Sequence, residues 1–485
     1  MSLAELRGYN FLVLKNNSVI RVILLAVSII LLTFLMVSSD WVPLNRLLNK
    51  SQSAITSGNV LTASIALAQA AQYSPNKFEL LENAGILAFE AGDTIGAKVY
   101  LTRVRESQNL SPGGMVLLGD IVHQEGNTKQ ALEFWEAANA AQEDSETYIK
   151  LIQAYRQTGD WENEVQSQRN LVALHPNKPE FTYELGLMLA VTEPEAALAY
   201  LSLAGELDVS IKNTVNALIR NLRSALNRGD PSYPFMIAGQ EMAAMGKWDL
   251  ALLAFSNAAE INPGYADAWA YLGETLQQSG LGGYKELDKA VKLDPDSIAV
   301  NTLLALYWQR QERYDLALVY LYAAAEVDNN NPALQAEIGN TLGLMGNIPA
   351  AETHYRLATS MEPRNPTYWN SLANYYIRYE IDIEENGAAA ARQAVILTPE
   401  DAVSLDILGQ IYLLQDNPIL AERFLERALT ADGEYAPAHL HSGLISIMDG
   451  DQLGAYQHFS AALSYSQPGS PTNDQARRLL ETYFP

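Results

Sequence analysis

The sequence contains no cysteine, which excludes disulfide bonds, cysteine zinc sites and cysteine nucleophiles. Alternating runs of β-branched and polar residues are scarce, whereas alanine and leucine are abundant, and this balance favours helices over strands. Basic residues are also few, since 32 Lys and Arg stand against 56 Asp and Glu and give a formal net charge of −24. Such a surface repels nucleic acid, so no nucleic-acid partner is expected. The excess of acid favours solubility and also suits basic partners.

Motifs that carry chemistry are absent from the sequence. It contains no GxSxG, no HExxH, no phosphate-binding glycine loop and no glycine-rich dinucleotide signature. His439, His441 and His458 are close in sequence, but no carboxylate recurs beside them at ligand spacing, so packing roles are expected. We therefore predict that the chain is not an enzyme and that it carries no cofactor and no metal site.

One uncharged run has the length of a membrane span. It covers the 18 residues from Val22 to Ser39, and as an α-helix it is about 27 Å long, close to the hydrocarbon thickness of a bilayer. Trp41 follows at the position of an interfacial aromatic. A cleaved signal peptide is the alternative, with Val37 and Ser39 as weak cleavage-site residues. We predict a short tail at 1–21 and a transmembrane helix at 22–39.

The charges that flank this run predict its orientation. Arg7, Lys15 and Arg21 precede the run, and Arg46 and Lys50 follow it. The positive-inside rule then favours a cytoplasmic amino terminus. The chain is expected to be a single-pass protein of the cell membrane whose remaining residues lie outside the cytoplasm.

Small residues recur through the rest of the chain at a period near 34. One series is formed by Ala70, Ala138, Ala204, Ala258, Ala290, Ala324, Ala358, Ala394, Ala428 and Ala462, with Val104 and Leu171 in its two gaps. A second series runs seven positions ahead of it and comprises Ala63, Ala97, Ala131, Ala197, Ala251, Ala317, Ala351, Ala421 and Ala455. Small side chains at fixed offsets let two helices approach closely, so each period predicts one helix pair.

Glycine and proline punctuate the same period. A glycine series lies twelve positions before the second alanine series, at Gly85, Gly119, Gly239, Gly339, Gly409 and Gly443. Other glycines are placed to turn the chain between the two helices, at Gly92, Gly126, Gly159, Gly246, Gly346 and Gly450. Prolines follow many second helices and stop them from continuing, at Pro75, Pro176, Pro263, Pro295, Pro363 and Pro399.

This pattern resembles the tetratricopeptide repeat (TPR) family. The family signature is matched by Trp269, Leu272, Gly273, Leu276, Ala290 and Pro295, and again by Trp369, Leu372, Ala373, Tyr376, Ala394 and Pro399. The resemblance implies an all-α fold, a right-handed α-solenoid of about twelve TPR helix pairs, here with one N-terminal transmembrane helix. Units 1–5 are expected at 44–209, units 6–12 at 232–469, and a C-terminal capping helix at 470–485.

An insertion interrupts the period between the fifth and sixth units, at 210–231. Ile211, Val215, Leu218, Ile219, Leu222 and Leu226 fall on one side of the helix that it predicts, while Lys212, Arg220, Arg223 and Arg228 fall elsewhere around it. Two interpretations remain open for this basic patch. It is either the solvated face of a packing helix, or a docking surface for an acidic partner or for lipid headgroups.

The TPR resemblance also implies a peptide-binding groove lined by the first helix of each unit. The positions that face this groove in the family correspond here to Glu274, Gln277, Gln278, Gln309, Arg310, Asn340, Asn370, Asn374, Ile377 and Arg378. Asparagine both donates and accepts, so it suits a peptide backbone, and arginine suits a carboxylate. We predict peptide binding by Arg310, Asn340, Asn370, Asn374, Arg378, Gln309 and Glu274. In the last unit the corresponding residues are Leu440, Leu444, Ile447 and Met448, which form either a contact patch or the seat of the capping helix.

Two classes of function fit an anchor followed by repeats. The first is a membrane-anchored scaffold that binds peptide or protein partners in the concave groove and organises an assembly at the membrane. The second is a permanent structural subunit of a membrane complex. The partners expected are therefore proteins or peptides, together with the lipid bilayer through one transmembrane helix.

Overall fold

The computed structural model describes residues 42–74, 76–107 and 109–485, and all regular structure in these ranges is helical. Within them, no helix is both long and apolar enough to cross a membrane. The predicted span at Val22–Ser39 lies outside the described residues and stays a prediction.

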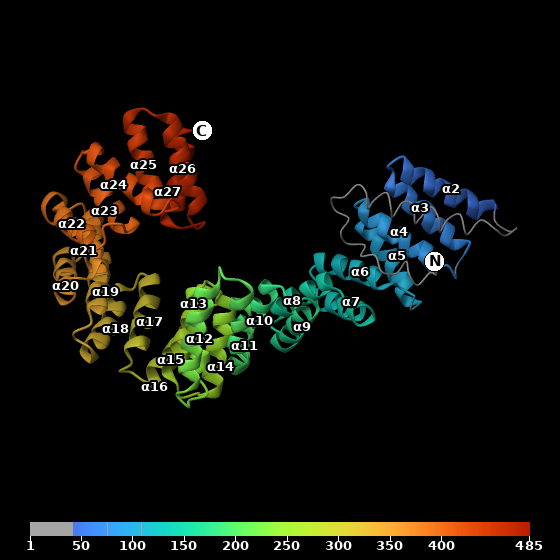
Figure 1. Ribbon diagram of the computed structural model, residues 1–485, viewed down its shortest axis with the longest axis horizontal. Helices are drawn as coiled ribbons and strands as arrows, with labels where there is room; N and C mark the ends of the chain where they lie inside the picture. Colours follow the sequence, from blue (N-terminus) through green and yellow to red (C-terminus); the bar gives the residue numbers. More distant parts are fainter. Residues whose placement is uncertain (1–41, 75, 108) are drawn as a thin grey trace. The chain divides into compact units, whose positions relative to one another are not determined.

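The helices form consecutive pairs in which the two partners are joined by a short turn (Figure 1). Five pairs precede an extra helix α12 (Lys212–Leu226): α2 (Val42–Thr56) with α3 (Val60–Gln72), α4 (Phe78–Glu90) with α5 (Thr94–Glu106), α6 (Pro112–Gln124) with α7 (Thr128–Ala141), α8 (Ser145–Thr158) with α9 (Trp161–Leu174), and α10 (Pro179–Thr192) with α11 (Pro194–Leu207).

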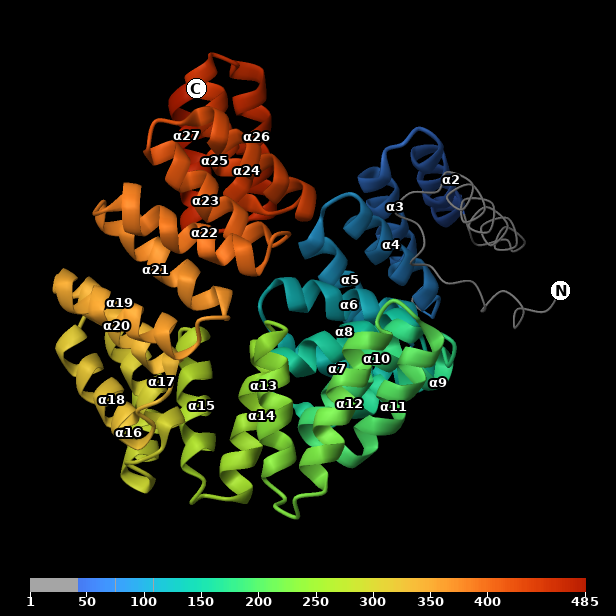
Figure 2. The same cartoon turned by 60° about the vertical axis from the view of Figure 1, so that its left-hand side comes forward.

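Seven pairs and a final helix α27 (Pro471–Tyr483) follow α12. The pairs are α13 (Tyr233–Ala244) with α14 (Trp248–Ile261), α15 (Ala266–Gln278) with α16 (Tyr284–Leu293), α17 (Ile298–Arg310) with α18 (Tyr314–Val327), α19 (Pro332–Leu344) with α20 (Ile348–Met361), α21 (Pro366–Tyr379) with α22 (Ala388–Leu397), α23 (Ala402–Leu414) with α24 (Pro418–Ala431), and α25 (Ala436–Asp449) with α26 (Gln452–Tyr465). The chain divides into two compact units between Ser224 and Ala225, inside α12. Within each unit, successive pairs pack against one another (Figure 2).

The two alanine series form the seams of these pairs, as the sequence predicts. Every alanine in both series is at most 1% exposed. A larger side chain at these positions would separate the two helices, because the interior is close-packed. The glycine series has the same role: a Cβ on Gly239 would lie 2.5 Å from Cε1 of the Phe255 ring. The ring therefore packs directly on the glycine backbone.

The turns between paired helices also follow the prediction. Gly92, Gly126, Gly159, Gly246, Gly346 and Gly450 have φ between 71° and 87°, a backbone conformation that glycine adopts without strain. The second helix then commonly begins after a capping side chain. For example, Asn127 Oδ1 accepts a hydrogen bond from the backbone N–H of Gln130.

A side chain near the start of several first helices locks the loop before it. The indole N–H groups of Trp269 and Trp369 donate to the carbonyls of Pro263 and Pro363, at 3.0 and 2.9 Å. Asn301 donates in the same way to Pro295. The sequence suggests only a core role for these tryptophans, but each also satisfies a carbonyl of the loop that closes the preceding pair.

Two of the helix pairs, α15 with α16 and α21 with α22, depart from the regular geometry. The second helix α16 has 10 residues, and Gly282 and Gly283 precede it with φ of 98° and 116°. The second helix α22, also of 10 residues, follows a π-helical turn η3 (Ile383–Gly387). Compared with the 34-residue period, the first of these repeats is two residues shorter and the second is two residues longer.

The last helix covers part of the apolar surface of the final pair. Leu479 and Leu480 of α27 belong to the same core cluster as Leu440, Leu444 and Ile447 of α25. Of the two interpretations of this patch, the structure therefore favours the seat of a capping helix.

Candidate functional site

The predicted peptide-binding residues lie in the compact unit Ala225–Pro485, on the first helices of four successive pairs. Glu274, Gln277 and Gln278 are on α15, Gln309 and Arg310 on α17, Asn340 on α19, and Asn370, Asn374, Ile377 and Arg378 on α21. We call the surface formed by these four helices the first-helix face. The structure gives these residues three different roles.

The guanidinium of Arg310 is occupied within the chain. Its two terminal nitrogens donate to the two carboxylate oxygens of Glu274, at 2.8 and 2.6 Å, and one of them also donates to the side-chain oxygen of Gln277. This forked pair joins α15 to α17. Arg310 and Glu274 therefore link two repeats, and a ligand carboxylate would have to displace Glu274 to reach the arginine.

A second set of side chains joins α17, α19 and α21. Gln309 Nε2 donates to Glu337 Oε1 at 2.6 Å and to Thr341 Oγ1 at 2.7 Å. Asn340 donates to the same Glu337 oxygen at 3.2 Å and accepts a hydrogen bond from Arg378 at 3.3 Å. With the Arg310 cluster, these contacts make a polar ladder across the first-helix face.

Glu337 is the central acceptor of this ladder, and it is not among the residues predicted from the sequence. A signal for it exists, because Glu337 lies three residues before Asn340 and one helical turn before Thr341, whose hydroxyl donates to the Glu337 carbonyl at 2.8 Å. Residues at these spacings share a helix face.

Asn370 is also a connecting residue. Its side chain is buried, and Nδ2 donates at 2.9 Å to the hydroxyl of Ser404 on α23, while Oδ1 is buried without a hydrogen-bond partner among the described residues. A buried amide of this kind fixes the distance between two repeats rather than meeting solvent.

The open part of the predicted site is therefore small and centres on α21. The side chain of Asn374 is exposed and forms no hydrogen bond within the described part of the chain, and the exposed side chain of Arg378 on the next turn has only its 3.3 Å contact to Asn340. Leu344 of α19 and Leu414 of α23 occupy the position equivalent to Arg378 in the neighbouring repeats and are 39% and 48% exposed. This surface suits a segment with a carboxylate or carbonyl group between apolar side chains.

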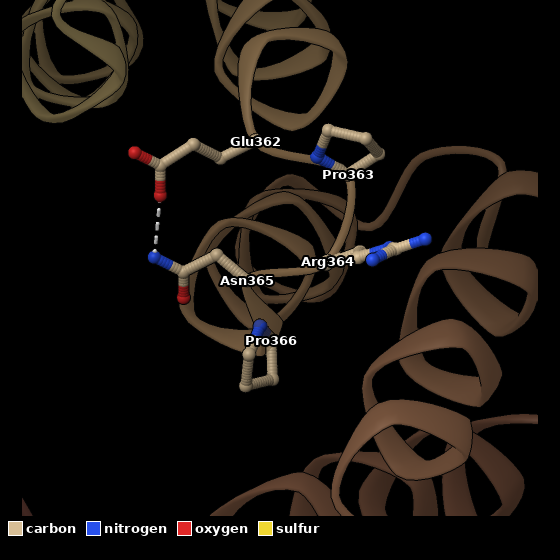
Figure 3. A pocket seen from close by; sticks show the side chains of 5 residues that line it. All are labelled: Glu362, Pro363, Arg364, Asn365 and Pro366. Carbon is tan, nitrogen blue, oxygen red and sulfur yellow. Dashed lines mark hydrogen bonds between the residues drawn. The ribbon is translucent and has the colours of Figure 1, made fainter.

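A separate hollow of about 530 Å³ lies at the loop between α20 and α21 (Figure 3). Its lining is five consecutive residues, Glu362 to Pro366, and Asn365 Nδ2 donates to Glu362 Oε2 at 2.8 Å. The hollow takes no residue from the polar ladder.

The histidines of α25 and α26 pair with near neighbours. Nδ1 of His439 lies within hydrogen-bond distance of Nδ1 of His458, at 3.1 Å, and the two tilted rings have centroids 5.3 Å apart. His439 Nε2 donates to the Gly433 carbonyl at 3.0 Å. Burial, with a smaller contribution from His439, lowers the pKa of His458. In residues 42–74, 76–107 and 109–485, no group of three or more potential metal ligands occurs.

His441 forms a buried ion pair across two repeats. Its Nδ1 lies 2.7 Å from Oδ1 of Asp406 on α23, and the two side chains are 12% and 5% exposed. Burial by itself lowers the pKa of the imidazole, but attraction to Asp406 and the hydrogen bond together outweigh it, so the pKa of His441 is raised.

Replacing Glu337 by alanine is expected to lower the free energy of unfolding by about 1–2 kcal/mol, because Gln309 and Asn340 lose a shared acceptor. Urea unfolding measures the change, and hydrogen exchange of α17 and α19 locates it. The control is Glu326→Ala on the exposed surface of α18, which is expected to change stability by less than about 0.5 kcal/mol. Equal effects of the two substitutions would show that the ladder contributes no stability.

Comparison with known proteins finds distant similarity only. The sequence matches no family model. A peroxisomal targeting signal receptor of Pichia angusta is 33% identical over 108 residues, which are 20% of this chain and 19% of the receptor. The similar stretch thus spans about a fifth of that relative's length.

Three solved structures align with this chain at low identity. Yeast Tom70 has a TM-score of 0.40 and 15% identity over 77% of this chain and 95% of its own. The APC/C hetero-tetramer Cut9-Hcn1 has a TM-score of 0.38 and 14% identity over 93% and 98%. PilF of Pseudomonas aeruginosa has a TM-score of 0.34 and 17% identity over 44% and 97%. These values are too low to transfer a ligand or a partner to this chain.

Proposed function

We propose that this chain is a tetratricopeptide repeat protein that acts as a membrane-anchored scaffold. It binds a peptide or protein segment on the first-helix face and holds the partner at the membrane surface. The proposal assigns no reaction to the chain. The membrane half of it rests on the uncharged run Val22–Ser39, and the binding half rests on the open surface around α21.

One observation carries the binding half. The polar ladder fixes α15, α17, α19 and α21 against one another, while Asn374 and Arg378 are left exposed between Leu344 and Leu414. A rigid frame with few open polar groups lowers the entropy cost of binding a segment. The similarity to a targeting-signal receptor supports a short protein segment as the ligand.

Substitution of both Asn374 and Arg378 by alanine is expected to weaken partner capture by roughly tenfold or more, because the variant removes the open amide and the only open cation of this surface. The measurement is the recovery of cross-linked partners with the tagged full-length chain, quantified by mass spectrometry. The matched control is Arg392→Ala with Gln393→Ala, on the second helix α22 of the same repeat.

Unchanged recovery of a stoichiometric partner in the Asn374/Arg378 variant would contradict binding on the first-helix face. It would favour the second function, a permanent subunit held by other surfaces.

Protease accessibility of the repeats in sealed cells tests the proposed membrane anchor and its orientation. Protection from added protease would contradict an extracytoplasmic repeat region. A mature chain that lacks its first forty residues would contradict the anchor.

A further inference from the structure

The extra helix α12 has one buried side and one exposed side. Val215, Leu218 and Leu222 are at most 1% exposed. Gly205 of α11 lies beside this buried side, since a Cβ on Gly205 would be in ordinary van der Waals contact with Cγ1 of Val215, at 3.6 Å. The buried side fixes the rotation of α12 about its axis, so the remaining side has a defined orientation.

That remaining side carries cations without partners. Lys212, Arg220 and Arg223 are exposed and form no ion pair within the described part of the chain. In an α-helix, residues eight and eleven apart are separated by about 80° and 20° around the axis, so the three lie on one side. We call them the basic stripe. Arg228 is not part of it, because its guanidinium lies 4.3 Å from the ring centroid of Tyr233.

The basic stripe is unusual for this chain. The net charge is −24, and many other cations are paired, for example Lys98 with Glu125, Lys150 with Asp120 and Arg169 with Glu193. The sequence of α12 and its flanking turns, in contrast, contains no Asp or Glu between Asp208 and Asp230. The Debye length at physiological ionic strength is about 8 Å, and a helix of 15 residues is about 22 Å long. A bound ligand therefore experiences the local positive charge more than the distant acid.

We propose that the basic stripe binds a carboxylate-rich segment of a partner protein, narrow enough to lie along α12 between Asp208 and Asp230. Arg220 and Arg223 bind its carboxylates through forked hydrogen bonds, and Lys212 adds a third charge. This site is distinct from the first-helix face and does not depend on the proposed function.

The width of the stripe favours a protein segment over a membrane. A planar anionic surface is also repelled by the rest of a chain whose net charge is −24. A single acidic helix or extended segment touches only the stripe. The stripe also has too few cations for nucleic-acid binding. It offers three, whereas proteins that bind nucleic acid commonly make roughly six to ten phosphate contacts.

The test uses the full-length chain in detergent and a fluorescent alanine-rich helical peptide of about 15 residues with glutamate at every fourth position. A peptide with glutamine at those positions is the neutral probe. Charge reversal by Arg220→Glu with Arg223→Glu is expected to weaken binding of the acidic peptide roughly tenfold. The matched control, Arg103→Glu with Lys129→Glu, reverses two other exposed cations of the first unit and is expected to bind the peptide as the wild type does.

Each outcome of the anisotropy titration decides the proposal. Binding that is lost in the α12 variant, kept in the control and weakened by salt supports it. Equal loss in the α12 variant and the control would show a response to net charge only and would overturn it, as would an equal affinity for the glutamine peptide. Binding to phosphatidylcholine–phosphatidylglycerol vesicles that requires the stripe, without binding of the acidic peptide, would assign the stripe to lipid headgroups instead.

Discussion

Replacing Phe255 by alanine is expected to lower the free energy of unfolding by about 3–5 kcal/mol. The ring is 1% exposed and packs on the backbone of Gly239 across the pair α13 and α14, so its removal leaves a cavity at the seam. The measurement is urea unfolding followed by circular dichroism, fitted with nearest-neighbour coupling between repeats, since arrays of repeats do not unfold in one step.

A double-mutant cycle makes this prediction specific to the seam. Gly239→Ala alone is expected to cost about 1–3 kcal/mol, because the added methyl group overlaps the Phe255 ring. In the double variant Gly239→Ala with Phe255→Ala the overlap is gone. Its loss of unfolding free energy is therefore expected to be smaller than the sum of the losses in the two single variants. Strict additivity would mean that the glycine has no role in the approach of the two helices.

Replacing Asp406 by asparagine is expected to cost about 3–5 kcal/mol near pH 6, because it breaks a buried ion pair by removing one partner. The cost depends on pH with a definite sign. The folded-state pKa of His441 is raised, so the stability that its charge contributes is fully present below the unfolded-state pKa of about 6.5. That contribution is lost as the pH rises through the folded-state pKa.

The stability difference between the wild type and Asp406→Asn should therefore shrink as the pH rises above about 6.5 and through the raised folded-state pKa of His441. Without the carboxylate, burial alone acts on His441 and lowers its pKa, so acid is expected to destabilise the variant more than the wild type. Thermal unfolding over this pH range measures both curves. Asp288→Asn is the control, since it breaks the exposed pair with Lys292 and is expected to change stability by less than about 1 kcal/mol at every pH. A pH-independent difference for Asp406→Asn would contradict the buried pair.

The candidate site shows where inference from sequence stops. The family resemblance selected helix positions that do lie on four neighbouring first helices, from Glu274 on α15 to Arg378 on α21. It did not reveal that Arg310 is bound by Glu274, or that Glu337 connects Gln309 with Asn340. The partners in these contacts between helices are 28 to 38 residues apart in the chain, and no local pattern states which of them meet.

The sequence by itself determined the helix pairs, their seams and their turns. These features depend on residues within one period, since small side chains such as Ala258 and Ala324 permit close approach and turn glycines adopt positive φ wherever the pattern recurs. Only the tertiary structure decided which polar side chains form hydrogen bonds or ion pairs with neighbouring repeats and which remain exposed to a partner. That outcome depends on the distance between neighbouring first helices and on the rotamers of long side chains, and both are set by the packing of whole repeats.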